Sequence, residues 1–232
     1  MSNVLITGAN RGIGLELVKR YAAAGHRVFA CCRVPSEASV LSEVAGTHDA
    51  VSIHGVQVTD ADSLAALATE LDGAPIDILI NNAGASTAME SQTLTNMDYD
   101  GWAELFAVNA MAPLRVLQTL MPNLQASEAE PAKAITITSQ MGALSLDWPV
   151  AYAYCSSKAA VNKVMRMASL ELKEQGIAVG LIHPGWVQTD MGGPNAAITV
   201  DESASGIMAT IDAIDLEVTG CFRTWQNEDH GW

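Results

Sequence analysis

Basic residues are scarce in this chain. Its 232 residues include 12 Lys and Arg against 26 Asp and Glu, a formal net charge of −14. Proteins that bind nucleic acid without sequence preference, or bind anionic lipid, need a basic surface. The charge balance argues against both classes, and we expect neither nucleic acid nor a membrane as a partner.

Long apolar runs and metal-ligand patterns are also missing. No segment reaches the length of a membrane span, and no basic stretch followed by an apolar one opens the chain. The four cysteines and five histidines do not show the spacing of metal ligands. We interpret the cysteines as small buried hydrophobes in a reducing compartment, and expect a cytoplasmic protein without a bound metal.

Linkers, internal repeats and low-complexity tracts are absent as well. Hydrophobic residues make up 49% and charged residues 16% of the chain, a globular composition. The length suits one α/β domain with a sizeable core. We therefore predict a single domain over residues 1–232, with a short C-terminal segment that contacts substrate.

Strand-like and helix-like segments alternate from end to end. This pattern predicts a Rossmann-type α/β fold, a doubly wound parallel sheet of about seven strands with helices on both faces. The helix over 99–124 is expected to bend or to be locally adjusted at Pro113. The strands are expected at 3–7, 28–32, 50–58, 76–80, 134–138, 177–182 and 219–224, and the later helices at 37–45, 63–71, 99–124, 151–175 and 202–214.

A glycine-rich turn connects the first strand to the first helix. In Thr7-Gly8-Ala9-Asn10-Arg11-Gly12-Ile13-Gly14, glycines permit a tight turn and let backbone N–H groups approach phosphate oxygens. Structural glycines alone can produce such a turn. Its place between a strand and an amphipathic helix favours a nucleotide site.

Tyr154 and Lys158 are separated by three residues, so on a helix they share one face. A neighbouring ammonium favours the phenolate over the phenol, whose ordinary pKa is near 10. We expect Tyr154 to give and take protons near neutral pH.

Together these motifs resemble the short-chain dehydrogenase/reductase family. The resemblance rests on the glycine loop, Asn81-Asn82-Ala83-Gly84, Ser139 and Tyr154-x-x-x-Lys158, in that order along nearly the whole chain. The opening stretch and residues 183–193 are similar to the branch with Sniffer-type carbonyl reductases and C-factor-like proteins.

The resemblance implies a role for each of four catalytic residues. Tyr154 would be the general acid for carbonyl reduction, and Lys158 would lower its pKa and bind the nicotinamide ribose. Ser139 would bind the substrate oxygen, and Asn109 would hold a water that links Lys158 to solvent. Taken singly, Ser139 could merely end a strand and Asn109 could satisfy a buried carbonyl.

The same resemblance implies a cofactor-binding set. Gln57 stands where the family often has Asp near the adenine, and its amide oxygen can still accept a hydrogen bond. The set comprises Gly8, Asn10, Arg11, Gly12, Ile13, Gly14, Arg33, Gln57, Val58, Asn82, Ala83, Gly84, Tyr154, Lys158, Pro184, Gly185, Val187 and Thr189.

The end of the second strand bears on which cofactor binds. NAD-specific sites place a carboxylate there for the ribose hydroxyls, whereas this chain has Cys32-Arg33. Arg33 and Arg11 could pair with a 2′-phosphate, although Arg11 alone could also simply face solvent. We therefore expect NADP(H).

The sequence says less about the substrate, the function and the oligomeric state. Lys and Arg are absent between Lys173 and Arg223, and Leu144, Leu146, Trp148 and Trp186 are apolar, which favours a small or moderately sized apolar ketone or aldehyde. We favour an NADP-dependent carbonyl reductase, with a non-catalytic signalling protein or a related lyase or epimerase as alternatives.

The family commonly forms a homodimer or homotetramer through the helices that correspond to 99–124 and 151–175. The resemblance therefore implies a homodimer or homotetramer for this chain.

Overall fold

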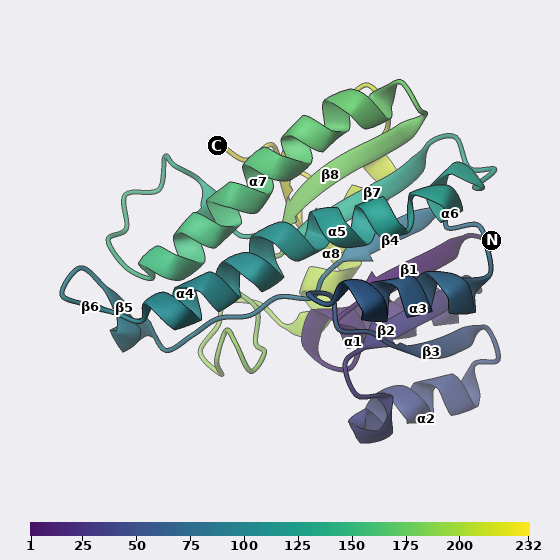
Figure 1. Cartoon of the computed structure of the whole chain (residues 1–232), viewed down its shortest axis with the longest axis horizontal. Coiled ribbons are helices and arrows are strands. Elements are labelled where there is room, and N and C mark those ends of the chain that lie inside the picture. Colours follow the sequence, from purple (N-terminus) through teal and green to yellow (C-terminus); the bar gives the residue numbers. More distant parts are fainter.

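Seven parallel strands form the central sheet of the computed structural model, which describes residues 1–232 (Figure 1). Their order in space reverses between β1 and β4, as in a doubly wound fold, so the predicted fold class is confirmed. From one edge to the other the strands are β3 (Val51–Gly55), β2 (Arg27–Cys32), β1 (Asn3–Thr7), β4 (Ile78–Asn81), β7 (Ala132–Ile137), β8 (Ile177–His183) and β9 (Cys221–Thr224).

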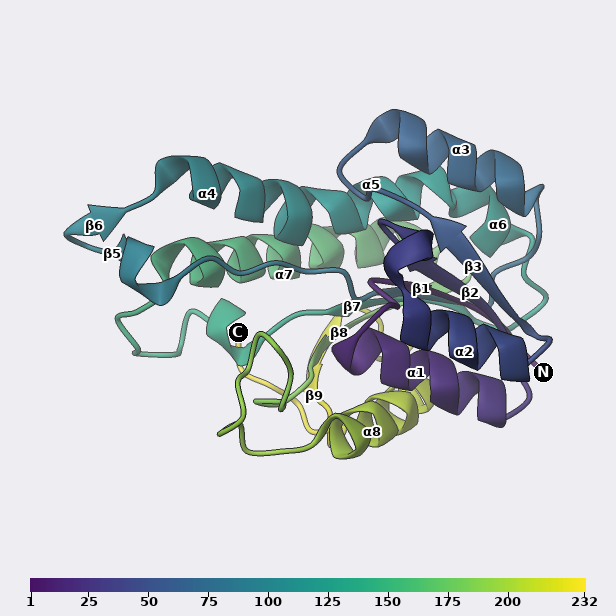
Figure 2. The same ribbon diagram turned by 90° about the horizontal axis from the view of Figure 1, so that it is seen from below.

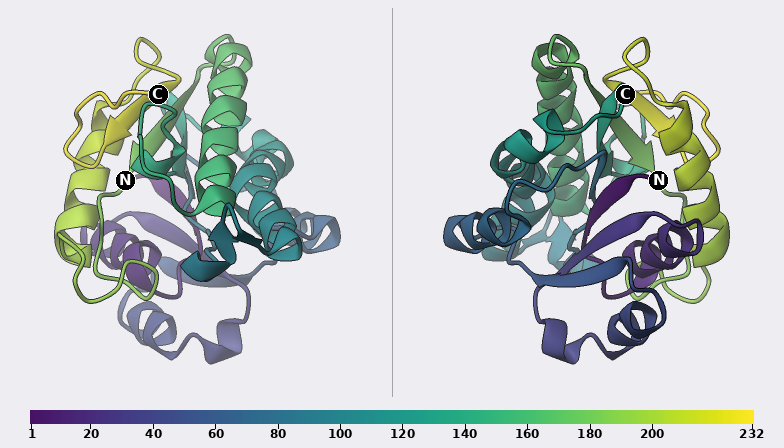
Figure 3. Two further views of the ribbon diagram at one scale, coloured as in Figure 1. Left: turned by 90° about the vertical axis from the view of Figure 1, so that its left-hand side faces the viewer. Right: turned by 90° about the vertical axis from the view of Figure 1, so that its right-hand side faces the viewer.

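Helices cover both faces of this sheet, and the strands twist between the two layers (Figures 2 and 3). One layer consists of α3 (Ala61–Leu71), α4 (Tyr99–Leu105), α5 (Ala112–Thr119), α6 (Met121–Gln125) and α7 (Tyr152–Lys173). The other consists of α1 (Gly12–Ala23), α2 (Ser39–Thr47) and α8 (Val200–Ala213). Short 3₁₀ turns cover Pro35–Glu37, Met89–Ser91 and Gln140–Gly142.

Two hydrophobic cores fill the spaces between the layers. Alternate residues of each central strand enter opposite cores, so that Leu5 packs with the α3, α5 and α7 side while Val4 and Ile6 pack with the α1 and α8 side. All three are fully buried. A strand covered on both faces needs no polar positions, which explains the unbroken apolar runs in the sequence.

The long helix expected over 99–124 is interrupted. A π-helical segment, Phe106–Met111, joins α4 to α5, and α5 ends at Thr119 before α6 begins at Met121. Pro113 has no N–H, so the carbonyl four residues earlier lacks its α-helical donor. The helix is therefore adjusted locally at Pro113, as expected, and the distortion lies in the π-helical turn just before the proline.

A small antiparallel hairpin was not predicted. Strands β5 (Gln92–Thr93) and β6 (Asn96–Met97) pair Gln92 with Met97 and Thr93 with Asn96. The hairpin lies at the end of the molecule where α4 and α7 begin (Figures 1 and 2). Strands of two residues are too short to produce a pattern of alternating side chains.

No helix combines the length and the apolarity that a membrane crossing requires. All four cysteines are free thiols, and Cys31 and Cys32 are buried in β2.

Candidate active site

The carboxyl ends of β1, β4, β7 and β8 bring together most of the predicted site residues. The glycine loop follows β1, Asn82 follows β4, Ser139 follows β7, and Pro184 follows β8. These strands are neighbours in the sheet and run in the same direction. The reversal of strand order between β1 and β4 is where doubly wound folds bind their ligands.

The glycine loop has the geometry of a phosphate cradle. Gly8 and Gly12 have φ values of 67° and 53°, which disfavour any other residue. A Cβ at Gly14 would collide with the Gly8 carbonyl. Arg11 precedes α1 without capping it through its side chain, so the first N–H groups of α1 have no capping acceptor. An anion such as a pyrophosphate fits there.

Hydrogen bonds of Asn82 and Thr7 connect this loop to the segment that follows β4, the neighbouring strand in the sheet. The Asn82 side-chain Nδ2 donates to the carbonyls of Thr7 and Gly8 at 3.0 and 3.1 Å. The Thr7 hydroxyl in turn accepts from the N–H groups of Asn82 and Ala83, both at 3.1 Å. Asn82 therefore shapes the loop itself.

Ser139 opens the 3₁₀ turn after β7. Its hydroxyl oxygen accepts a hydrogen bond from the Met141 N–H at 3.1 Å, which leaves the hydroxyl proton free for another acceptor. The turn is held against α7 by Asn162, which accepts from the Thr138 hydroxyl at 2.6 Å and donates to the Gly142 carbonyl at 3.3 Å. Sequence reasoning did not find Asn162.

Tyr154 is the third residue of α7, and its phenol lies near Ser139. Burial raises the pKa of Tyr154 to about 12, and hydrogen bonding to the Ser139 side chain acts against this shift. We expected Lys158 to lower the pKa of Tyr154, but in the folded chain this pKa is raised. At neutral pH the phenol is protonated, which suits a proton donor.

Lys158 lies one turn further along α7 with 6% of its surface exposed. Its ammonium donates to the Ile137 carbonyl at 3.1 Å and lies 5.8 Å from the centre of the Tyr154 ring. Burial lowers the pKa of Lys158 to about 8. Burying a charged group costs folding free energy. Because buried groups with shifted pKa values are common at functional sites, Lys158 is a candidate functional residue.

Asn109 occupies the π-helical segment and is buried. Its Oδ1 accepts from the Ala85 N–H and its Nδ2 donates to the Ala85 carbonyl, both at 2.9 Å, and Nδ2 also donates to the Ser157 hydroxyl at 3.0 Å. A Cβ added at Gly84 would lie 3.5 Å from Asn109 Oδ1 and 3.7 Å from Lys158 Nζ. The amide and the ammonium therefore adjoin the same backbone.

The two arginines expected near a 2′-phosphate differ in their surroundings. Arg33 directly follows β2, is exposed, and makes no ion pair or side-chain hydrogen bond. Arg11 instead pairs with Asp190 at 2.7 Å, a contact that sequence reasoning missed. Gln57 is exposed after β3 and Val58 is buried. Asn10 is exposed and Ile13 partly buried in the glycine loop.

The segment after β8 closes toward the glycine loop. Gly185 has a φ of 89°, and Val187 is buried and bridges to Ile198. The Pro184 carbonyl accepts from the Ser203 hydroxyl of α8 at 2.7 Å. A Cβ at Gly12 would lie 3.3 Å from the Thr189 methyl carbon, so the two loops are in close contact.

The apolar residues after Ser139 form a separate cavity. It has a volume of about 320 Å³ and is lined by Leu144, Leu146 and Trp148, together with Tyr152 and Cys155 of α7. Tyr154 does not line it. Leu144, Leu146 and Trp148, from which the sequence suggested an apolar substrate, therefore line one cavity beside the start of α7.

Comparison with known proteins agrees with this geometry. The model of the short chain dehydrogenase family matches residues 2–198. The chain belongs to this family.

Among the relatives of this short-chain dehydrogenase, the C-signal protein of Myxococcus xanthus is 39% identical over 168 residues, which cover 72% of this chain and 99% of that protein. An NADPH-bound carbonyl reductase from chicken fatty liver has a TM-score of 0.92 at 34% identity, covering 100% of this chain and 99% of that one. The carbonyl reductase Sniffer of D. melanogaster has a TM-score of 0.92 at 28% identity, with both chains covered completely. The predicted family and branch are thereby confirmed.

The buried ammonium predicts a pH-dependent stability. Because the pKa of Lys158 falls from 10.5 to about 8 on folding, the unfolded chain binds more protons between these values, and the stability of the fold rises with pH through that window. Lys158→Met removes this dependence. We expect the variant to gain at most about 3 kcal/mol relative to wild type at pH 7, and the gain to vanish near pH 10.5.

Urea denaturation of both proteins at pH 7 and pH 10.5 measures this difference. Lys163→Met, which changes an exposed lysine of the same helix, serves as the control and should shift stability equally at both pH values. A pH-independent effect of Lys158→Met would show that the ammonium is not desolvated.

Proposed function

We propose that this short-chain dehydrogenase is an NADP(H)-dependent reductase of small, largely apolar ketones or aldehydes. The observation that carries the proposal is the convergence of Ser139, Tyr154, Lys158 and Asn109 beside the glycine loop. A loop that only bound a nucleotide would not need a buried ammonium and a phenol beside it.

The residues available for the cofactor fit its parts. The N–H groups at the start of α1 would hold the pyrophosphate, Arg33 the 2′-phosphate, and Lys158 the nicotinamide ribose. Val187 and Thr189, in the loop after β8, would contact the nicotinamide carboxamide. When bound, the nicotinamide supplies the hydride. The NADPH and NADP bound in similar carbonyl reductases support the choice of NADP(H) as the cofactor.

The protein's part is to stabilise and protonate the carbonyl oxygen. Negative charge develops on that oxygen as the carbonyl carbon is reduced, and preorganised donors lower the barrier. Ser139, whose hydroxyl oxygen accepts from the Met141 N–H, donates one hydrogen bond to the carbonyl oxygen. Tyr154 donates its phenolic proton, and Lys158 nearby stabilises the phenolate that remains. Asn109 holds Ala85 and Ser157, and so fixes the walls around the ammonium.

A panel of ketones, aldehydes and diones tested with NADPH and NADH decides between this function and its alternatives. Consumption of NADPH with a carbonyl compound supports a reductase. Cofactor binding without turnover of any compound would favour the signalling alternative, and turnover without net cofactor consumption a lyase or epimerase.

Removing the phenolic hydroxyl tests the proton donor. We expect Tyr154→Phe to reduce kcat roughly 10²–10⁴-fold, because proton transfer is lost, while NADPH still binds. Steady-state kinetics and cofactor fluorescence give the two values. Tyr152→Phe, two residues earlier on the same helix, is the control and should leave kcat unchanged. A wild-type kcat for Tyr154→Phe would show that Tyr154 is not the proton donor.

Arg33 tests the choice of cofactor. We expect Arg33→Ala to weaken NADPH binding about tenfold or more and NADH binding hardly at all, because a charge-assisted contact to the 2′-phosphate is lost. Arg11→Ala should cost less, because Arg11 is already paired with Asp190. Equal losses for NADPH and NADH in Arg33→Ala would contradict the assignment.

A homodimer or homotetramer is part of the proposal. Apolar side chains remain exposed on α4, on the π-helical segment and on α7, namely Tyr99, Met111, Met167 and Leu170. An association through these helices would cover them. We expect sedimentation at micromolar concentration to show a dimer or tetramer, and a monomer would contradict it.

A further inference from the structure

The catalytic helix begins without a cap of its own. The residue before α7 is Ala151, whose methyl side chain cannot accept a hydrogen bond. Ala151 is fully buried and has a φ of 52°, in the left-handed region that residues other than glycine rarely adopt. The N–H groups of the first turn therefore need acceptors from elsewhere in the chain.

Gln92 of the β5–β6 hairpin supplies one such acceptor. Its side-chain Oε1 accepts a hydrogen bond from the backbone N–H of Tyr154 at 2.8 Å, and its Nε2 donates to the Thr87 carbonyl at 3.0 Å. The backbone N–H can only donate and the carbonyl can only accept, so both contacts require the same orientation of the amide. The side chain is fully buried.

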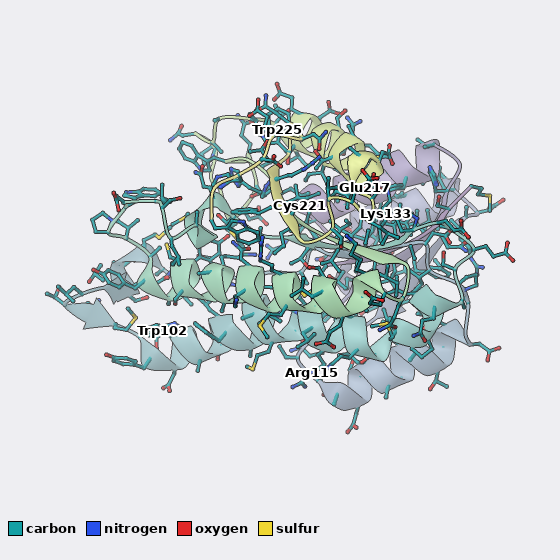
Figure 4. The ribbon with its side chains drawn as sticks, turned by 90° about the horizontal axis from the view of Figure 1, so that it is seen from above. Trp102, Arg115, Lys133, Glu217, Cys221 and Trp225 are labelled. Atoms are coloured by element: carbon teal, nitrogen blue, oxygen red, sulfur yellow. The ribbon has the colours of Figure 1, made fainter.

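Further contacts fix the segment that carries Gln92 and the start of α7. The segment that carries it leaves β4 through Ala85, whose N–H and carbonyl are both bound by the Asn109 side chain. On the other side, Trp102 of α4 points toward α7, and its indole N–H donates to the Ser156 hydroxyl at 2.9 Å (Figure 4). The start of α7 is thus fixed by contacts from the hairpin and from α4.

We propose that Gln92 is a positioning residue for the proton donor, holding the first turn of α7 so that the Tyr154 phenol stays beside Ser139. The inference rests on the function proposed above. Tyr154 is the third residue of the helix, and fraying of a single turn would move its hydroxyl away from the substrate oxygen. A buried N–H without an acceptor favours such fraying, because it regains a partner only by opening to water.

Gln92→Met tests the inference, because methionine fills a similar volume and accepts no comparable hydrogen bond. We expect kcat to fall roughly tenfold to hundredfold through misplacement of the phenol, with NADPH affinity unchanged within about twofold. Asn123→Ala is the matched control: it removes another buried amide, which donates to the Ala74 carbonyl at 2.8 Å, far from Tyr154. It should lower the melting temperature and leave kcat unchanged.

Gln92→Glu provides a rescue with its own pH signature. Its carboxylate can accept from the Tyr154 N–H, but only the protonated acid can also donate to the Thr87 carbonyl. We expect kcat relative to wild type to rise as the pH is lowered, whereas the ratio for Gln92→Met stays constant. A loss in Gln92→Met no larger than in Asn123→Ala, or a constant ratio for Gln92→Glu, would overturn the inference.

Amide hydrogen exchange gives a readout that does not depend on turnover. In Gln92→Met, exchange at residues 152–156 should accelerate tenfold or more, while residues 160–172 of the same helix keep the wild-type rates. Unchanged exchange at 152–156 would overturn the role of Gln92 even if no carbonyl compound is reduced. Absence of turnover by the wild-type protein would count against the proposed reductase alone.

Discussion

The hydrogen bond from the Lys158 ammonium to the Ile137 carbonyl sets the arrangement of the site. It fixes α7 against the end of β7, and so determines how far Tyr154 lies from the Ser139 turn that follows the same strand. The contact places a charge where water is nearly absent, and burial lowers its pKa accordingly. A chain selected for stability alone would place an apolar residue there.

Four side-chain amides around this hydrogen bond connect the loops of the site to one another. Asn162 holds the Ser139 turn through the Gly142 carbonyl, Asn82 holds the glycine loop, Asn109 holds Ala85, and Gln92 holds the start of α7. In each case a side-chain amide binds backbone of a different element. Amides can donate and accept at once without carrying charge, so they join loops without adding to the electrostatic cost of the ammonium.

The sheet could be predicted because most of its central strands are buried apolar runs, as with Asn3–Thr7 before Gly8. Tyr154, Lys158 and the glycine loop could be predicted because their chemistry depends on spacing along one element. Gln92 and Asn162 could not, since each acts through a contact between elements distant in sequence. The sequence also could not predict that the pKa of Tyr154 is raised, because the rise comes from burial, a property of the folded chain, which outweighs the hydrogen bond to Ser139.

The π-helical segment has a consequence for chain length in this family. A π-helical turn contains one residue more than an α-helical turn, so Phe106–Met111 corresponds to an insertion into an otherwise regular helix. A homologue that lacked both this extra residue and the proline would have room for a continuous α-helix, and its asparagine would lose the register that directs Asn109 to Ala85. The amide contact between Asn109 and Ala85 thus depends on the number of residues in this stretch as well as on the asparagine itself.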